Sequence, residues 1–210
     1  MTITLYSDQK DNGNMTQSAA QKWDQKYATA SLETSTAPCF VLQNHSHLLP
    51  FYGQALDLAC GLGGNARFLA QCGLKVDAWD ISDNALTILN NWASLNRLPI
   101  TPLITDLEQM LLPYQKYDVI VVSRYLDRKL FKQIEQTLKP NGLLFYQSFL
   151  EPVVDQGPQN PNFYLHTGEL VKAFDKLNCL VNGEGWLDDA PTSQKDNSKQ
   201  RYSWFVGKKK

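Results

Sequence analysis

The sequence predicts an α/β fold, in which a doubly wound, mostly parallel seven-stranded sheet ends in an antiparallel hairpin. Three observations lead to this prediction. Short apolar runs alternate with amphipathic helical stretches, the first run leads directly into a glycine-rich turn, and the last two runs have no helix between them. Such alternation is typical of parallel βαβ units, whose ligand sites lie at the carboxyl ends of the strands.

The 210-residue chain has the length of one ordinary domain. We divide it into a polar arm expected to be disordered, a helical lid segment and the sheet domain: residues 1–14, 15–50 and 51–210. In the lid segment Ala20, Trp23 and Tyr27 recur at helical spacing, and an apolar stretch over 40–49 ends at Pro50.

Seven apolar runs are expected to form the strands. They cover residues 55–59, 75–79, 100–105, 117–122, 143–149, 180–187 and 202–207. The run over 117–122 is rich in β-branched residues and lacks polar alternation, which predicts a central strand buried on both faces. Pro102 weakens the third strand, because proline cannot donate to the ladder.

Amphipathic stretches between these runs predict the helices. Gly73 is expected to end the first of them, Ser82 to cap the second and Thr167 to cap the last. Residues 139–142 are expected to turn the chain into the fifth strand. Three of these helices have a predicted inward face. It consists of Ala85, Ile88, Leu89, Trp92 and Leu95 in the helix after the second strand, of Leu126, Leu130, Ile134 and Leu138 in the helix after the fourth strand, and of Leu170, Phe174 and Leu177 in the last helix.

Composition and charge argue against several classes of partner. With 20 Lys and Arg against 21 Asp and Glu, spread along the chain, we expect neither nucleic acid nor anionic membrane as a partner, but a small-molecule substrate. The four cysteines lack paired spacing, and His45 and His47 have no evident third ligand, so we expect no metal site. Without a signal sequence or membrane-length apolar run, we expect a cytoplasmic monomer or homodimer.

The glycine-rich turn after the first strand carries the clearest functional signal. Gly61 and Gly63 leave backbone amides bare beside a helix N-terminus, where a ligand can approach closely. Asp80 ends the second strand, where a carboxylate can accept both hydroxyls of a ribose. Asp80 can equally help to cap the helix that begins beside Ser82, and that alternative stays open.

This pattern resembles the class I S-adenosylmethionine-dependent methyltransferases, with Asp57, Gly61 and Gly63 followed by the second acid Asp80. The chain is most similar to the tellurite-resistance-type and thiopurine-type small-molecule enzymes. That similarity rests on three regions. The first helix of the sheet domain contributes Asn65, Phe68, Leu69 and Ala70, and the start of the last helix contributes Gly168, Glu169 and Leu170. The third region is an aromatic N-terminal helix that closes over the cofactor, with Trp23, Asp24, Lys26 and Tyr27. The sequence departs from the family pattern with Ala59 in place of a common glycine and Gly64 in place of arginine.

The resemblance implies a Rossmann-like methyltransferase fold and S-adenosylmethionine as cofactor. It places Asp80 on the ribose, Ile81 against the adenine and Asp106 on the adenine amino group. The implied cofactor-binding residues are Asp57, Ala59, Gly61, Gly63, Asn65, Asp80, Ile81, Asp106, Leu107, Ser123 and Arg124.

The candidates for substrate contact or catalysis are Trp23, Tyr27, Arg124 and His166. Structural roles are also open for these residues: Trp23 and Tyr27 can belong to the hydrophobic core, and Arg124 can form a surface ion pair. Because the cofactor carries an activated methyl group, catalysis by proximity needs no acid and base pair.

Two other functions remain open at this stage. Gly61, Gly63 and Ala66 also satisfy the dinucleotide fingerprint of a nicotinamide-dependent oxidoreductase. The third possible function is that of a non-catalytic cofactor-binding protein with the same fold, because a fold does not determine a function.

Overall fold

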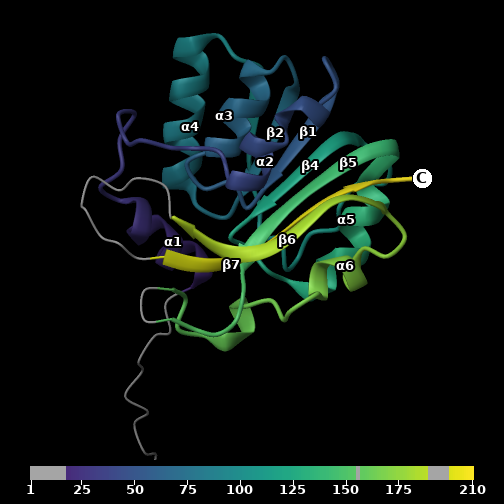
Figure 1. Cartoon of the computed structure of the whole chain (residues 1–210). Helices are drawn as coiled ribbons and strands as arrows, with labels where there is room; N and C mark the ends of the chain where they lie inside the picture. Colours follow the sequence, from purple (N-terminus) through teal and green to yellow (C-terminus); the bar gives the residue numbers. More distant parts are fainter. Residues whose placement is uncertain (1–17, 155–156, 189–198) are drawn as a thin grey trace, which may run out of the picture.

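A computed structural model of the chain describes residues 18–154, 157–188 and 199–210 (Figure 1). Seven strands form one sheet in the order β3-β2-β1-β4-β5-β7-β6. β1 to β5 are parallel, and β7 runs antiparallel to both β5 and β6. The predicted sheet is confirmed. Its strands are β1 (Gln54–Leu58), β2 (Lys75–Asp80), β3 (Ile100–Ile104), β4 (Tyr117–Ser123), β5 (Leu138–Phe149), β6 (Asn178–Asp188) and β7 (Lys199–Lys208).

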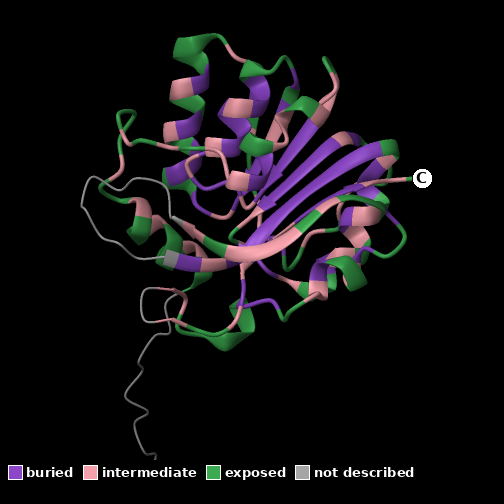
Figure 2. Ribbon diagram, in the orientation of Figure 1, coloured by how far each residue is buried: buried purple, intermediate pink, exposed green. Residues whose placement is uncertain are grey.

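The centre of the sheet is buried on both faces, as the apolar run over 117–122 predicts. β4 lies between β1 and β5, and Val119, Ile120, Val121 and Val122 are completely buried. Figure 2 shows this inner part of the sheet as a continuous buried layer. Alternate residues of a strand point to opposite faces, so each face of β4 contributes to a separate core cluster.

Helices cover both faces of the sheet (Figure 1). α2, α3 and α4 pack on one face, in a cluster that includes Val41, Leu69 and Leu89. α5 and α6 lie on the other face, where Ile134 and Leu170 are buried. The helices are α1 (Ala19–Tyr27), α2 (Phe40–Asn44), α3 (Gly64–Gln71), α4 (Asp83–Asn96), α5 (Phe131–Thr137) and α6 (Glu169–Ala173), with short 3-10 helices η1 (Ser46–Leu48), η2 (Arg128–Leu130) and η3 (Pro161–Phe163).

α1 differs from the other α-helices because none of its residues is buried. It begins with a capping box, in which Ser18 and Gln21 bond to each other's backbone N–H groups. The helix contacts α4 near the carboxyl end of the parallel strands (Figure 1). The expected arm over 1–14, and the expected start of order at Met15, lie outside the described residues.

The prediction that Leu95 faces inward from α4 is wrong. Its side chain is 73% exposed, whereas Ala85, Leu86, Leu89 and Ala93 are buried. Positions 86, 89 and 93 follow the helical repeat, and Leu95 lies about 200° beyond Ala93 around the axis. The predicted N-cap of this helix is confirmed, because the Ser82 hydroxyl accepts a hydrogen bond from the Ala85 N–H group.

The helix predicted after β4 is shorter than its apolar spacing indicates. The chain forms η2 and then α5, and Leu138 pairs with Tyr117 as the first residue of β5. Pro140 disfavours a helical conformation for the residue before it, which ends the helix at Thr137. The residues expected to face inward are nevertheless all buried: Leu126, Leu130, Ile134 and Leu138.

Thr167 does not cap the last helix, as we had expected. Gly168, with a φ of 71°, is the N-cap of α6 and offers no side-chain bond. The Glu169 carboxylate instead reaches back to the His166 N–H group, so a glutamate of the first turn satisfies that donor. α6 ends at Ala173, although Phe174 beyond it is buried.

Within the described residues, no helix combines the length and the apolar character needed to cross a membrane.

Candidate functional site

The glycine-rich turn and the tip of β2 are joined by a direct hydrogen bond. The Gly61 N–H group donates to one carboxylate oxygen of Asp80 at 2.7 Å, and the Ser82 N–H group donates to the other at 2.9 Å. Burial raises the pKa of the Asp80 carboxyl, and these backbone bonds oppose the rise. Ser82, and not Asp80, is the N-cap of α4. The two parts of the predicted nucleoside site are therefore held against each other.

The turn itself needs unusual backbone conformations. Ala59, Gly61 and Gly63 all have positive φ values, of 56°, 52° and 77°. A Cβ atom on Gly61 would lie 2.6 Å from the Tyr27 hydroxyl oxygen, so only glycine allows this close approach. Ala59 adopts the left-handed conformation despite its side chain, which shows how the turn forms without the glycine common in the family.

Asp57 is completely buried just before the turn and serves as an anchor for it. Its oxygens accept hydrogen bonds from the Asn65 side chain at 3.2 Å and from the Ala66 N–H group at 2.9 Å. The Oδ1 atom of the Asn65 side chain in turn accepts from the Cys39 N–H group at 2.9 Å. Burial, the largest cause, raises the pKa of Asp57 to about 7. The network connects β1, α3 and the segment before α2.

α1 is held beside this turn by polar contacts. The Ser82 hydroxyl donates to the Asp24 carboxylate at 2.6 Å, the Asn84 N–H group donates to the same oxygen at 3.2 Å, and the Asn84 side chain donates to the Asp24 carbonyl at 3.0 Å. Trp23 and Tyr27 stack with ring centroids 6.2 Å apart. These contacts place Tyr27 over Gly61. Because α1 has no buried residue, the core interpretation of its aromatic pair finds no support.

The ends of β3 and β4 complete the surroundings of the candidate site. The Thr105 N–H group donates to the Asp80 carbonyl at 2.8 Å, which brings the loop after β3 to the tip of β2. Both oxygens of Asp106 accept bonds from its own turn, and Leu107 is buried. Ile81, next to Asp80, is half-buried.

Arg124 follows Ser123 at the end of β4 with a φ of 55°. Its N–H group donates to the Gln147 carbonyl at 2.9 Å, and its Nε atom donates to the Tyr202 hydroxyl at 3.3 Å. The Gln147 side chain accepts from the Val41 N–H group at 3.0 Å. The strand end is thus tied to β5, β7 and α2.

Burial holds three ionisable groups of the candidate site, Tyr27, Cys39 and Cys60, in their neutral forms. Burial raises the pKa of Tyr27 to about 12 and that of the Cys39 thiol to about 12, and it raises the pKa of Cys60 well above its usual value. A tyrosine hydroxyl and two thiols in this state are neither bases nor nucleophiles near neutral pH. These groups can shape the site and donate hydrogen bonds.

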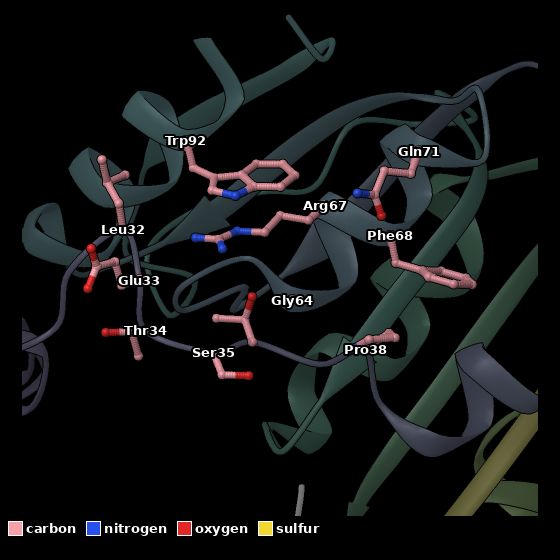
Figure 3. A pocket seen from close by; sticks show the side chains of 11 residues that line it. Leu32, Glu33, Thr34, Ser35, Pro38, Gly64, Arg67, Phe68, Gln71 and Trp92 are labelled. Atoms are coloured by element: carbon pink, nitrogen blue, oxygen red, sulfur yellow. The ribbon is translucent and has the colours of Figure 1, made fainter. Parts of the chain in front are cut away.

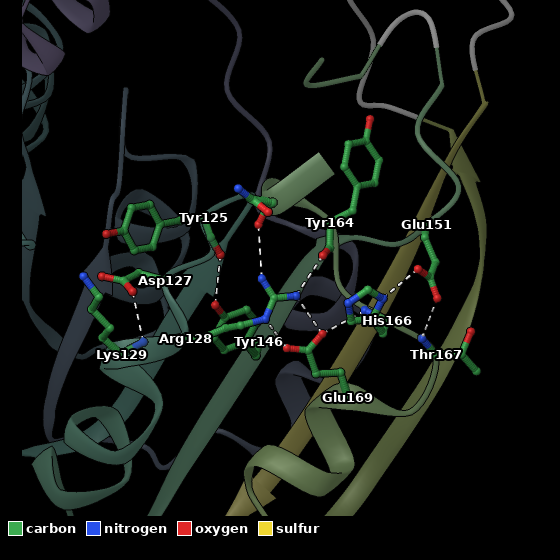
Figure 4. A network of polar contacts seen from close by, with 11 residues as sticks. Tyr125, Asp127, Arg128, Lys129, Tyr146, Glu151, Tyr164, His166, Thr167 and Glu169 are labelled. Atoms are coloured by element: carbon green, nitrogen blue, oxygen red, sulfur yellow. Dashed lines mark hydrogen bonds and ion pairs between the residues drawn. The ribbon is translucent and has the colours of Figure 1, made fainter. Parts of the chain in front are cut away.

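His166 lies in a separate polar network, shown in Figure 4. Its Nδ1 atom pairs with Glu151 at 2.7 Å, while Arg128 holds Glu169 through Nε at 2.6 Å and Nη2 at 2.9 Å. Arg128, His166 and Glu169 border a cavity of about 470 Å³ with Phe131. None of the hydrogen bonds of His166 within the described chain reaches the glycine-rich turn, so the structure does not bring it together with Asp80.

Sequence reasoning did not assign roles to Asp24, Asn84 and Gln147, which position the site through their side chains. The signal for Gln147 is a polar residue inside the apolar run of β5. The contact of Asp24 with Asn84 has no signal in a single sequence, because 60 residues separate the two positions.

The residues present fit a nucleoside cofactor. The Gly61 backbone carries no side chain and faces the Tyr27 hydroxyl, the end of a side chain on α1, and the Asp80 carboxylate beside it is oriented by two backbone bonds. Each carboxylate oxygen can accept more than one hydrogen bond, so ribose hydroxyls can still be received. Within the described residues no group of three or more His, Cys, Asp or Glu side chains could hold a metal ion.

Residues 55–142 match a family model described as a methyltransferase domain. The ubiquinone biosynthesis O-methyltransferase of Coxiella burnetii is 26% identical over 133 residues, covering 61% of this chain and 53% of that protein. The probable S-adenosyl-L-methionine-dependent methyltransferase TehB of Haemophilus influenzae is 30% identical over 89 residues, covering 41% of this chain and 31% of that protein. The chain spans about half, or less, of the length of these relatives.

Among solved structures, TehB from Haemophilus influenzae matches with a TM-score of 0.71 at 20% identity, covering 90% of this chain and 67% of that one. At this identity the match shows a shared fold.

Proposed function

The chain contains a class I S-adenosylmethionine-dependent methyltransferase domain, similar in sequence and fold to TehB, and from this premise we propose that it methylates a small-molecule acceptor. The observation that carries the proposal is the bond between the Gly61 N–H group and Asp80. It joins a bare backbone turn to a carboxylate at the tip of the adjacent strand, which is the geometry that nucleoside recognition needs.

The proposed cofactor contacts follow from this geometry. Asp80 accepts the ribose hydroxyls, Ile81 and Leu107 pack against the adenine, and Asp106 meets its amino group. Asp57 and Asn65 hold the turn in shape without needing to touch the ligand. The remaining proposed contacts lie along the turn and at the end of β4: Ala59, Gly61, Gly63, Ser123 and Arg124.

S-adenosylmethionine, when bound, supplies a methyl group activated for in-line displacement. The work left to the protein is alignment and the exclusion of water. Trp23 and Tyr27 suit this role, because their stacked rings lie over the turn on a helix that polar contacts tie to the start of α4. The high pKa of Tyr27 argues against a role as general base. An acceptor that is already nucleophilic fits such a site.

Small-molecule enzymes among the relatives support the proposed class of acceptor. The ubiquinone biosynthesis O-methyltransferase is one of them. All four cysteines are free thiols, which agrees with action in a reducing compartment such as the cytoplasm. We leave monomer and homodimer open.

The nicotinamide-dependent alternative finds no support in the sheet. After β5 the chain forms an antiparallel pair, β6 and β7, where a dinucleotide fold would add a second parallel half. A measurement of turnover distinguishes the proposed enzyme from a non-catalytic cofactor-binding protein.

Two measurements test the proposal. Calorimetry should show saturable binding of S-adenosylhomocysteine and no binding of NADH. Labelled S-adenosylmethionine should then transfer its methyl group to at least one member of a panel of thiols, chalcogen oxyanions, amines and carboxylates. NADH binding without S-adenosylhomocysteine binding would favour the oxidoreductase, and cofactor binding without turnover on any acceptor would favour the non-catalytic protein.

A further inference from the structure

Arg67, on the face of α3 that packs toward α4, is an enclosed cation. It is 8% exposed, and its Nε and Nη2 atoms are enclosed without a hydrogen-bond partner among the described residues. No carboxylate of the described residues forms an ion pair with it. The guanidinium carbon lies 4.5 Å from the centroid of the Trp92 ring (Figure 3). Since a guanidinium stays protonated in proteins, this is a largely buried charge that packs against an aromatic face.

Arg128 shows how the edge of a guanidinium that carries Nε and Nη2 binds a carboxylate elsewhere in the chain. Its Nε and Nη2 atoms bind the two oxygens of Glu169 at 2.6 and 2.9 Å. Such a pair of parallel bonds matches a planar carboxylate. In Arg67 this edge has no partner, although Trp92 already fixes the plane of the guanidinium. The arrangement is that of a carboxylate receptor without its carboxylate.

Arg67 borders a cavity of about 320 Å³ between α3, α4 and the segment 32–38. In Figure 3 its side chain extends beneath Trp92 toward Leu32 and Glu33. Apolar side chains, Phe68 and Pro38 among them, form part of the wall. Arg67 therefore places a cation beside apolar surface at this cavity, with its Nε and Nη2 edge enclosed in the present conformation.

Gly64 shapes this cavity. A Cβ atom there would lie 2.4 Å from the Ala37 carbonyl oxygen, so the segment can lie against the start of α3 only because residue 64 is glycine. This is the position at which the sequence departs from the arginine of tellurite-type enzymes. Residues 35–38 make no backbone hydrogen bond to the rest of the described chain, so they can move outward to admit a ligand at the enclosed edge.

We propose that this cavity binds a small carboxylic acid with an apolar body, whose carboxylate pairs with the Nε and Nη2 edge of Arg67. Glu33 lines the same cavity and disfavours highly charged anions, so a singly charged carboxylate fits better than a doubly charged phosphate. Trp92 and Phe68 provide the apolar contact. The inference does not depend on the methyltransferase proposal, because the cofactor is assigned to Gly61 and Asp80.

Benzoate and benzamide are matched probes, since they share a ring and differ in charge. Calorimetric titration of the full chain should show saturable benzoate binding with a dissociation constant on the order of 1 mM. Binding of benzamide and of inorganic phosphate should be at least about tenfold weaker. In NMR, the Nε–H signal of Arg67 should shift with benzoate along the same saturation curve.

Three variants separate the proposed site from general effects. Arg67→Met should weaken benzoate binding at least about tenfold, and Arg67→Lys should weaken it too, because lysine keeps the charge and loses the bidentate edge. Arg128→Met is the control and should bind benzoate like the unaltered chain, since Glu169 already fills its edge. The proposal is overturned if benzoate does not saturate, if Arg67→Met binds it equally well, or if phosphate binds more tightly.

Discussion

Two regions meet at the glycine-rich turn, and they are built in opposite ways. One, which we call the turn platform, comprises residues 57–64 and 80–82, and its acids Asp57 and Asp80 are 0% and 8% exposed. The other, the α1 cover, comprises residues 18–27 and buries no side chain; its Trp23 is 36% exposed. The platform is fixed by the sheet and by backbone bonds, whereas the cover rests on polar contacts with the start of α4. The difference suggests that ligand entry moves the cover and leaves the platform in place.

The largest expected effect concerns the buried acid of the platform. Because burial raises the pKa of Asp57 from 3.8 to about 7, its ionisation disfavours the folded state. The stability of the unaltered chain relative to Asp57→Asn should therefore be greatest below about pH 4, should fall as the pH rises toward 7 and should stay level above that. The total change is on the order of 4 kcal/mol. Urea unfolding across this pH range measures it, and a constant difference would contradict the assigned cause.

Asp80→Ala is expected to weaken S-adenosylhomocysteine binding by about 1.5 to 3 kcal/mol, the scale of hydrogen bonds to a charged group. The substitution removes the acceptor for ribose and also the bond that orders Gly61. Calorimetry measures the affinity, and circular dichroism checks the fold. An unchanged affinity in a folded variant would show that the ribose assignment is wrong.

On the cover, Trp23→Ala should lower turnover about tenfold while the free energy of unfolding changes by less than about 1 kcal/mol. The reason is that this side chain lies outside the core and stacks on Tyr27. Steady-state kinetics and thermal unfolding are measured on the same preparation. A large fall in Tm with normal specific activity would show that Trp23 stabilises the fold and does not contribute to turnover.

The smallest expected effect belongs to Asp24→Ala, which removes the carboxylate that Ser82 and Asn84 bind. Losing these bonds should cost about 1 kcal/mol of local stability, so the amides of α1 should exchange about fivefold faster with solvent. The amides of β1 and β4 serve as the internal control and should not change. Equal acceleration in the core strands would mean that α1 is part of the main cooperative unit.

The sequence predicts the platform better than its surroundings because the platform is local. The apolar strand, the glycines and Asp80 lie close together in the chain, and each carries a conformational or chemical preference that can be read residue by residue. The parallel pairing of the first five strands follows similarly from the alternation of strand and helix. The error at Leu95 arose because the apolar spacing placed the inward face on the side of Ile88 and Leu95, whereas the buried face is turned toward Leu86 and Ala93.

What the sequence did not reveal depends on long-range contacts. Gln147 meets Val41 across 106 positions and Cys39 meets Asn65 across 26, and neither pair has a local pattern. His166 was selected from its place in a loop after β5, but its partner Glu151 holds it in a different polar network. Packing in three dimensions decides such contacts, and a single sequence does not encode them in its spacing.

The most direct test is a crystal structure of the chain with S-adenosylhomocysteine. The account predicts that the ribose hydroxyls bond to Asp80, that the adenosine lies beside the turn at Gly61 and Gly63, and that Tyr27 moves from its present position against Gly61 while the platform backbone stays unchanged. A ligand bound elsewhere, with Tyr27 still closing the turn, would contradict it.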